Sequence, residues 1–143
     1  MILLVEDDPD DELLMRMALK DNKIDCEMAL ARDGIEALEF LFGEGKHAGR
    51  DPGQMPSLII LDLKLPKMNG IEVLRHIRAD ERTRIIPVVV LTSSIRDQDM
   101  IDCYELGANS YIQKPLNFND FVHVVRQLGT YWLNTNKLPG GFA

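Results

Sequence analysis

The sequence predicts an α/β protein in which five strands alternate with five helices and form one parallel sheet. Short aliphatic runs alternate along the chain with segments whose apolar residues recur every three or four positions. Such alternation is typical of a doubly wound sheet with helices on both faces. The 143 residues, of which 45% are hydrophobic, are enough for the core of a single domain.

The first strand is expected at Ile2–Val5, which is entirely aliphatic. Pro9 suits the first position of the helix that follows, so Asp8 is its predicted N-cap. The predicted apolar face of this helix consists of Leu14, Met17 and Ala18.

The second strand and helix surround Gly34, which marks a break between them. Alternation with polar or small residues places the strand at Cys26, Met28 and Leu30. The apolar face of the helix is expected at Ile35, Leu38, Leu41 and Phe42. Residues 43–56, rich in glycine and polar residues, are then predicted to form the one long loop.

The third strand is predicted at Leu58–Leu61, because four apolar residues run between Pro56 and Asp62. A run of this kind suits a strand that is buried on both faces. Asp62 then lies at the carboxyl end of the strand, where parallel sheets place their ligand sites. Asn69 is the predicted N-cap of a helix over residues 69–79.

The remaining elements are a strand at 85–91, a helix at 96–106, a strand at 109–113 and a helix at 117–133. Gly107 suits the C-terminal cap of the first of these helices.

Composition excludes several classes of function. The net charge of −7 leaves no basic excess for binding nucleic acid. The two cysteines, Cys26 and Cys103, have no metal-ligand spacing, which is consistent with free thiols in a reducing cytoplasm. No apolar run approaches the length that crosses a membrane, so we expect a cytoplasmic protein.

Polar side chains follow four of the five predicted strands. Glu6 and Asp7 follow the first, Asp62 the third, Thr92 the fourth and Lys114 the fifth. Because the carboxyl ends of parallel strands meet at one edge of a sheet, we expect these five side chains to converge in one crevice.

Three converging carboxylates repel one another, and a hard divalent cation such as Mg²⁺ relieves that repulsion. A carboxylate beside the cation can then attack phosphorus, while a hydroxyl and an ammonium hold the phosphoryl oxygens. Each feature alone also suits a structural role. The acidic run could begin a helix, Thr92 could cap the helix that follows it, and Lys114 could belong to an ordinary loop. All of them together, each at a strand end, favour a functional site.

The chain resembles the receiver domains of two-component response regulators over essentially its whole length. The resemblance rests on residues 3–8 (LLVEDD), 61–70 (LDLKLPKMNG), 90–92 (VLT) and 114–115 (KP). It implies the flavodoxin-like, CheY-like fold, with strand order 2-1-3-4-5. It also implies a receiver domain over residues 1–134, a tail over 135–143 and no output domain, so that output would come from a surface of the domain itself.

The resemblance implies a role for each candidate residue. Asp62 would be the phosphoacceptor, and Asp7 and Asp62 would bind Mg²⁺ directly. Glu6 would act mostly through water, and the backbone carbonyl of Lys64 would be the remaining protein ligand. The protein would then be a phosphoacceptor with slow autodephosphorylation and not an enzyme.

Three further residues complete the implied site. Thr92 would hydrogen-bond the phosphoryl group and Lys114 would pair with it. Tyr111, three residues before Lys114, matches the aromatic residue of the family's switch, which turns inward when the threonine moves.

The long loop and the ending at residues 131–139 resemble single-domain regulators paired with bacterial phytochrome histidine kinases, so a kinase of that type is the implied partner. Relatives also dimerise through the last two helices and the strand between them. In the last helix, Phe118, Phe121, Val122, Val125 and Trp132 form a stripe that would cover the sheet. A second stripe predicts a homodimer face at Val124, Leu128 and Tyr131.

Two other classes of protein fit this sequence less well. A phosphatase with an aspartate nucleophile usually has a second aspartate two residues later, where this chain has Lys64. A flavin-binding protein needs a phosphate loop after the first strand, and the loop at residues 6–9, with three acidic residues, would repel a phosphate. An intermediate phosphoryl carrier in a longer relay and a binding module that is independent of phosphorylation both stay open.

Overall fold

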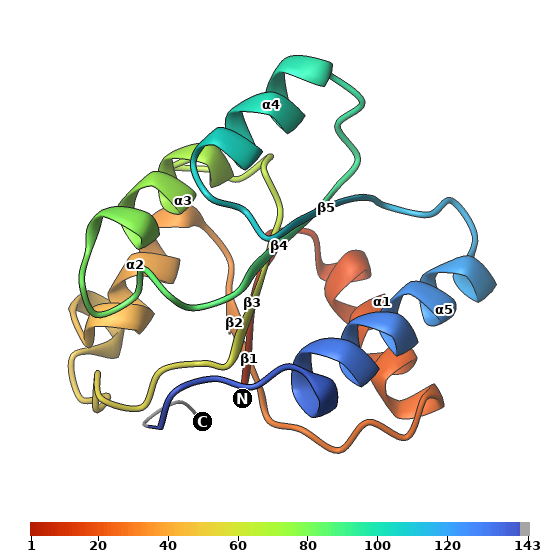
Figure 1. Cartoon of the computed structure of the whole chain (residues 1–143), viewed down its shortest axis with the longest axis horizontal. Coiled ribbons are helices and arrows are strands. Elements are labelled where there is room, and N and C mark those ends of the chain that lie inside the picture. Colours follow the sequence, from red (N-terminus) through yellow and green to blue (C-terminus); the bar gives the residue numbers. More distant parts are fainter. Residues whose placement is uncertain (141–143) are drawn as a thin grey trace.

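In the computed structural model, which describes residues 1–140, a five-stranded parallel sheet lies between two layers of helices (Figure 1). The strand order is β2-β1-β3-β4-β5, which confirms the predicted fold class. The strands are β1 (Ile2–Val5), β2 (Met28–Ala31), β3 (Leu58–Leu61), β4 (Val88–Thr92) and β5 (Ser110–Gln113). The helices are α1 (Pro9–Asp21), α2 (Gly34–Phe42), α3 (Gly70–Ala79), α4 (Asp97–Glu105) and α5 (Phe118–Leu128).

Two short helical segments complete the described chain. A 3₁₀ turn at Gly45–His47 lies within the long loop after α2. A π-helical segment at Gly129–Thr135 continues α5 beyond Leu128. Asp8 and Asn69 cap α1 and α3 as predicted, each through its side-chain oxygen.

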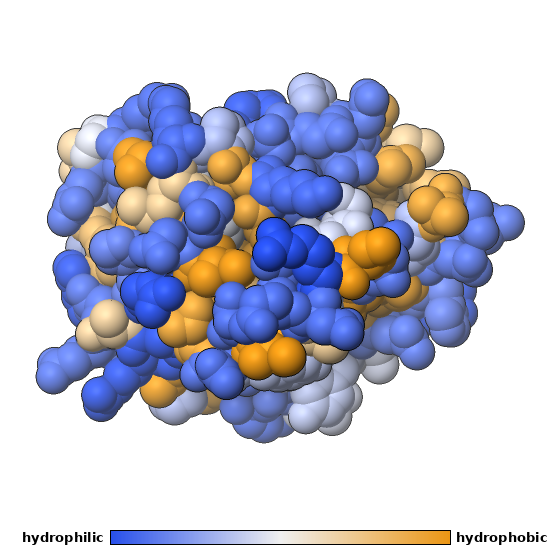
Figure 2. Space-filling view, turned by 90° about the horizontal axis from the view of Figure 1, so that it is seen from above, coloured by the Kyte–Doolittle hydropathy of each residue, from blue (hydrophilic) through white to orange (hydrophobic). Residues whose placement is uncertain are grey.

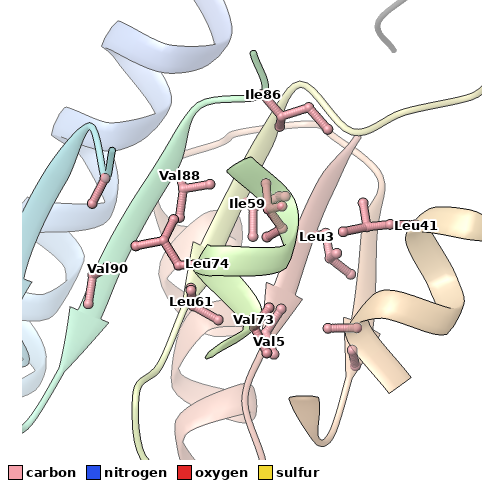
Figure 3. Close-up of a cluster of buried hydrophobic side chains, with 14 of the residues drawn as sticks. Leu3, Val5, Leu41, Ile59, Leu61, Val73, Leu74, Ile86, Val88 and Val90 are labelled. Carbon is pink, nitrogen blue, oxygen red and sulfur yellow. The ribbon is translucent and has the colours of Figure 1, made fainter. Parts of the chain in front are cut away.

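Side chains alternate across the sheet, so each central strand contributes to two cores. On the face that α2, α3 and α4 cover, Leu3, Ile59 and Val88 lie in one cluster of buried residues (Figure 3). On the face that α1 and α5 cover, Ile2, Leu58 and Val89 lie in the other. This two-sided burial explains why the strands read as continuous aliphatic runs.

The register brings the carboxyl ends of the strands to one edge. Val5 is aligned with Leu61, Leu61 with Val90, and Thr92 with Gln113. The residues that follow these strands therefore emerge side by side. Figure 2 looks onto the molecule from the side toward which the strands run, and shows a mostly hydrophilic surface interrupted by hydrophobic patches.

Some element predictions were wrong in detail; β2, for example, begins at Met28, so Cys26 precedes it. The core face of α1 is Met15, Ala18 and Leu19, while Met17 is 46% exposed. This stripe has the same spacing as the predicted one, shifted by one residue, and the helix is apolar enough at residues 13–19 to allow both. β4 begins at Val88 and not at residue 85, because the chain is still turning there and the Ile86 N–H donates to the carbonyl of Thr83.

Helical structure continues through Thr135, the first residue of the predicted tail. Residues 141–143 of that predicted tail lie outside the described residues.

The predicted dimer face on the last helix was wrong in one member. Leu128 is only 6% exposed and belongs to the core, and Val124 is half-buried against the same cluster. Tyr131 alone is exposed, at 50%. The reason is that α5 packs on α1 as well as on the sheet, so both of its apolar stripes are needed inside the domain.

Candidate phosphoacceptor and metal site

Three carboxylates meet where β1 and β3 end. Glu6, Asp7 and Asp62 each place one oxygen within 4.8 Å of the others. Glu6 and Asp62 are buried, with exposed fractions of 4% and 6%, whereas Asp7 is exposed. The sequence-based prediction that these residues converge is confirmed.

Lys114, which follows β5, places its ammonium group in this cluster. Its Nζ donates hydrogen bonds to Glu6 Oε1 at 2.7 Å, Asp62 Oδ2 at 2.8 Å and Asp11 Oδ2 at 2.6 Å. The side chain is 14% exposed. An ammonium group has three protons, so these three carboxylates saturate it.

Asp11 is the member of this cluster that sequence reasoning missed. It stands in the first turn of α1, where an acidic residue is favoured by the helix dipole alone. The usable signal was its place close behind Glu6 and Asp7, on a helix whose N-terminus Pro9 sets directly after the strand end.

Burial and charge act in opposite directions on these groups. Burial raises the pKa of Glu6 to about 7, the hydrogen bond from Lys114 opposes that rise, and the charge of Asp62 adds to it. For Lys114, burial would lower the pKa, but the hydrogen bonds to Asp11, Asp62 and Glu6 raise it above its usual value. Lys114 therefore stays an ammonium group at neutral pH.

Thr92 and Tyr111 are connected through Ser94. Thr92 is fully buried at the end of β4, and its Oγ1 accepts the backbone N–H of Ser94 at 3.2 Å. The half-buried Tyr111 donates its hydroxyl to the carbonyl of Ser94 at 3.4 Å. Thr92 also accepts the backbone N–H of Lys114 through its carbonyl oxygen at 2.7 Å, which ties the fourth and fifth strand ends together.

The loop after Asp62 is closed tightly. The backbone N–H of Lys64 donates to Asp62 Oδ1 at 3.3 Å, and that of Gly70 donates to the carbonyl of Leu63 at 2.9 Å. A Cβ at Gly70 would lie 2.2 Å from the carbonyl oxygen of Asp62. Only glycine fits there, because α3 begins directly against the peptide of Asp62.

The sequence also matches a family of known proteins. A family described as the response regulator receiver domain matches residues 2–126. The chain belongs to this family.

Relatives of this receiver domain include regulators from light-signalling systems. It is 42% identical over 138 residues to the response regulator Rcp1 of Synechocystis sp., and the match covers 96% of this chain and 92% of Rcp1. The structure of the phosphorylated cyanobacterial phytochrome response regulator RcpA matches with a TM-score of 0.88, at 40% identity over 97% of each chain.

A solved structure of Rcp1 bears on the metal. The Mn²⁺-bound form of Rcp1 matches this receiver domain with a TM-score of 0.87 and 42% identity, over 97% of this chain and 98% of that one. Here Glu6, Asp7 and Asp62 offer hard oxygen ligands, and the exposure of Asp7 leaves room for the waters that such ions retain. These residues therefore fit a divalent cation.

Among residues 1–140, no helix is both long and apolar enough to span a bilayer.

Proposed function

We propose that this receiver domain accepts a phosphoryl group on Asp62 from a histidine kinase, in a reaction that requires Mg²⁺. The observation that carries the proposal is the place of Asp62 between two kinds of partner. Its carboxylate belongs to the acidic triad and also accepts a hydrogen bond from Lys114. A phosphoryl group on that carboxylate would have a cation on either side.

In the proposed step, a carboxylate oxygen of Asp62 attacks the phosphorus of a phosphohistidine. A phosphorus–oxygen bond forms, the phosphorus–nitrogen bond breaks, and the histidine nitrogen leaves with the electron pair. Lys114 would move its hydrogen bond from Asp62 to a phosphoryl oxygen, and the hydroxyl of Thr92 would donate to another.

The carboxylates of Glu6, Asp7 and Asp62 and the backbone carbonyl of Lys64 would hold Mg²⁺. When bound, the ion supplies positive charge that neutralises the charge developing on the phosphoryl oxygens.

The chain of contacts from Thr92 through Ser94 to Tyr111 supports a switch. A Thr92 hydroxyl that turns toward a phosphoryl group would weaken its contact with the N–H of Ser94 and so disturb the carbonyl that Tyr111 holds. Tyr111 would report phosphorylation to the surface formed by α4, β5 and α5.

The name of RcpA, a phytochrome response regulator, supports a kinase of the phytochrome type as the partner. The two free cysteines, Cys26 and Cys103, support a location in the reducing cytoplasm.

We further propose that two copies associate through α4, β5 and α5. On this surface three apolar side chains of α4, Met100, Ile101 and Tyr104, are 40–50% exposed. Tyr131, on the segment that continues α5, is also 50% exposed. Sedimentation with and without beryllofluoride should show a dimer. Monomer alone in both conditions at high concentration would contradict the proposal.

The phosphoacceptor is tested by intact mass after incubation with Mg²⁺ and acetyl phosphate. The wild type should gain one phosphoryl group, whereas Asp62→Asn should gain none. Asp10→Asn is a matched control, because Asp10 is an exposed aspartate of α1 near the site. Equal modification of wild type and Asp62→Asn would refute the role of Asp62. Failure of the wild type with both acetyl phosphate and a phosphorylated kinase would refute the proposed function.

A further inference from the structure

Asp11 differs from the other carboxylates at the site in what it contacts. The acidic triad that fits a cation consists of Glu6, Asp7 and Asp62. The three acceptors of the Lys114 ammonium are Glu6, Asp62 and Asp11. Glu6 and Asp62 thus belong to both sets, whereas Asp11 belongs only to the set of Lys114 acceptors.

The backbone fixes where Asp11 stands. Pro9 and the Asp8 cap set the start of α1, and Met15 anchors the helix in the core one turn later. Asp11 and Met15 line a cavity of about 10 Å³ beneath the cluster, together with Leu91 of β4 and Phe121 of α5. This volume holds at most about one water. The carboxylate is therefore held at the apolar rim of the site and is only 28% exposed.

We propose that Asp11 is a positioning residue for phosphorylation. It holds the ammonium group of Lys114 in place while Glu6 and Asp62 contact the cation and the phosphoryl group. The inference rests on the proposed function of Asp62. It assigns to Asp11 a role that the acidic triad cannot fill.

The reason lies in how the partners of Lys114 change during the reaction. A cation bound by the triad takes up charge on Glu6 and Asp62, and an oxygen of Asp62 becomes bonded to phosphorus. Asp11 is then the one acceptor of Lys114, among the residues described, that lies outside the triad. Lysine has a flexible four-carbon stem, so one fixed hydrogen bond restricts the directions of its other two N–H groups.

The test compares phosphorylation rates with acetyl phosphate and Mg²⁺, followed by intact mass. Asp11→Ala should slow the reaction about tenfold, the size expected for a lost hydrogen bond to a charged group. Asp11→Asn keeps an acceptor oxygen in the same place and should stay within about threefold of the wild type. Asp10→Ala is the matched control, since it removes the same charge from the same helical turn, and should react at the wild-type rate.

A second comparison separates positioning from general effects. In a Lys114→Ala background, Asp11→Ala should cause no further loss, because its effect passes through the lysine. A wild-type rate for Asp11→Ala, or an equal slowing with and without Lys114, would overturn the inference. Urea unfolding of each variant confirms that the folded protein is being compared.

A third readout does not depend on phosphorylation. In ¹H–¹⁵N spectra of lysine ammonium groups, Lys114 should give a signal protected from exchange in the wild type and in Asp11→Asn, and lose it in Asp11→Ala. An unchanged signal in Asp11→Ala overturns the inference even if the wild type is phosphorylated. Conversely, a wild type that is never phosphorylated refutes the proposed function while the spectra still report the Asp11–Lys114 contact.

Discussion

Lys114 and Arg78 are two partly buried cations at opposite ends of the sheet, and they have different kinds of partner. Lys114 follows β5 and donates to three carboxylates. Arg78, in the last turn of α3, donates within residues 1–140 only to neutral oxygens near the start of β4 and β5. These acceptors are the carbonyl oxygens of Gly107, Arg84 and Ile86 and the side-chain oxygen of Asn109.

The difference shows which end of the sheet is fixed and which can change. Carbonyl oxygens belong to the backbone and cannot exchange partners without moving it, so Arg78 acts as part of the framework. The carboxylates around Lys114 carry more negative charge than one ammonium neutralises, and the structure adds Asp7 to them. That excess leaves the cluster able to accept a further cation.

The largest expected effect on the free energy of unfolding comes from removing Arg78, which joins the end of α3 to the starts of β4 and β5. Arg78→Met should lower the free energy of unfolding by about 4 kcal/mol, since four acceptors lose a charged donor at about 1 kcal/mol each or more. Urea unfolding in EDTA and again in Mg²⁺ measures it. The loss should be the same in both conditions. A loss that Mg²⁺ reverses would contradict the assignment of Arg78 to the framework.

Lys114→Met should lower the free energy of unfolding by about 3 kcal/mol in EDTA, because Glu6 and Asp62 remain buried without their counter-ion. Mg²⁺ should restore much of this loss by binding the folded state. The same urea experiment therefore distinguishes the two cations. If Mg²⁺ stabilises Lys114→Met no more than it stabilises the wild type, the cluster does not hold a cation in the way proposed.

The smallest expected effect tests whether the stability contributed by an ion pair depends on burial or on pairing alone. Arg16 of α1 pairs with Glu12 one turn earlier at 3.0 Å, but its side chain is 49% exposed. Arg16→Ala should cost about 0.5 kcal/mol or less, and high salt should reduce even that. A cost near that of Lys114→Met would mean that ion pairing alone accounts for the stability at the site.

The sequence predicted the strand ends well and the cation contacts poorly. Aliphatic runs that stop at polar residues located Glu6 and Asp62, and the short strand predicted at 109–113 located Lys114, because parallel strands deliver their ends to one edge. The roles of Asp11 and Arg78 depend on which way a helix faces, and a run as apolar as that of α1 does not fix its rotation from sequence. Leu128 was misplaced for a related reason, since nothing in the sequence of α5 indicates that α1 packs beside it.

Gly70 has a consequence for how the site can respond to a new charge. Since the backbone of α3 lies against the carbonyl oxygen of Asp62, the proposed phosphoacceptor is mounted on a rigid support. In mechanical terms, β3 and the start of α3 form the stiff side of the site. The compliance lies with the hydroxyl of Thr92 and the ammonium of Lys114, which turn about single bonds.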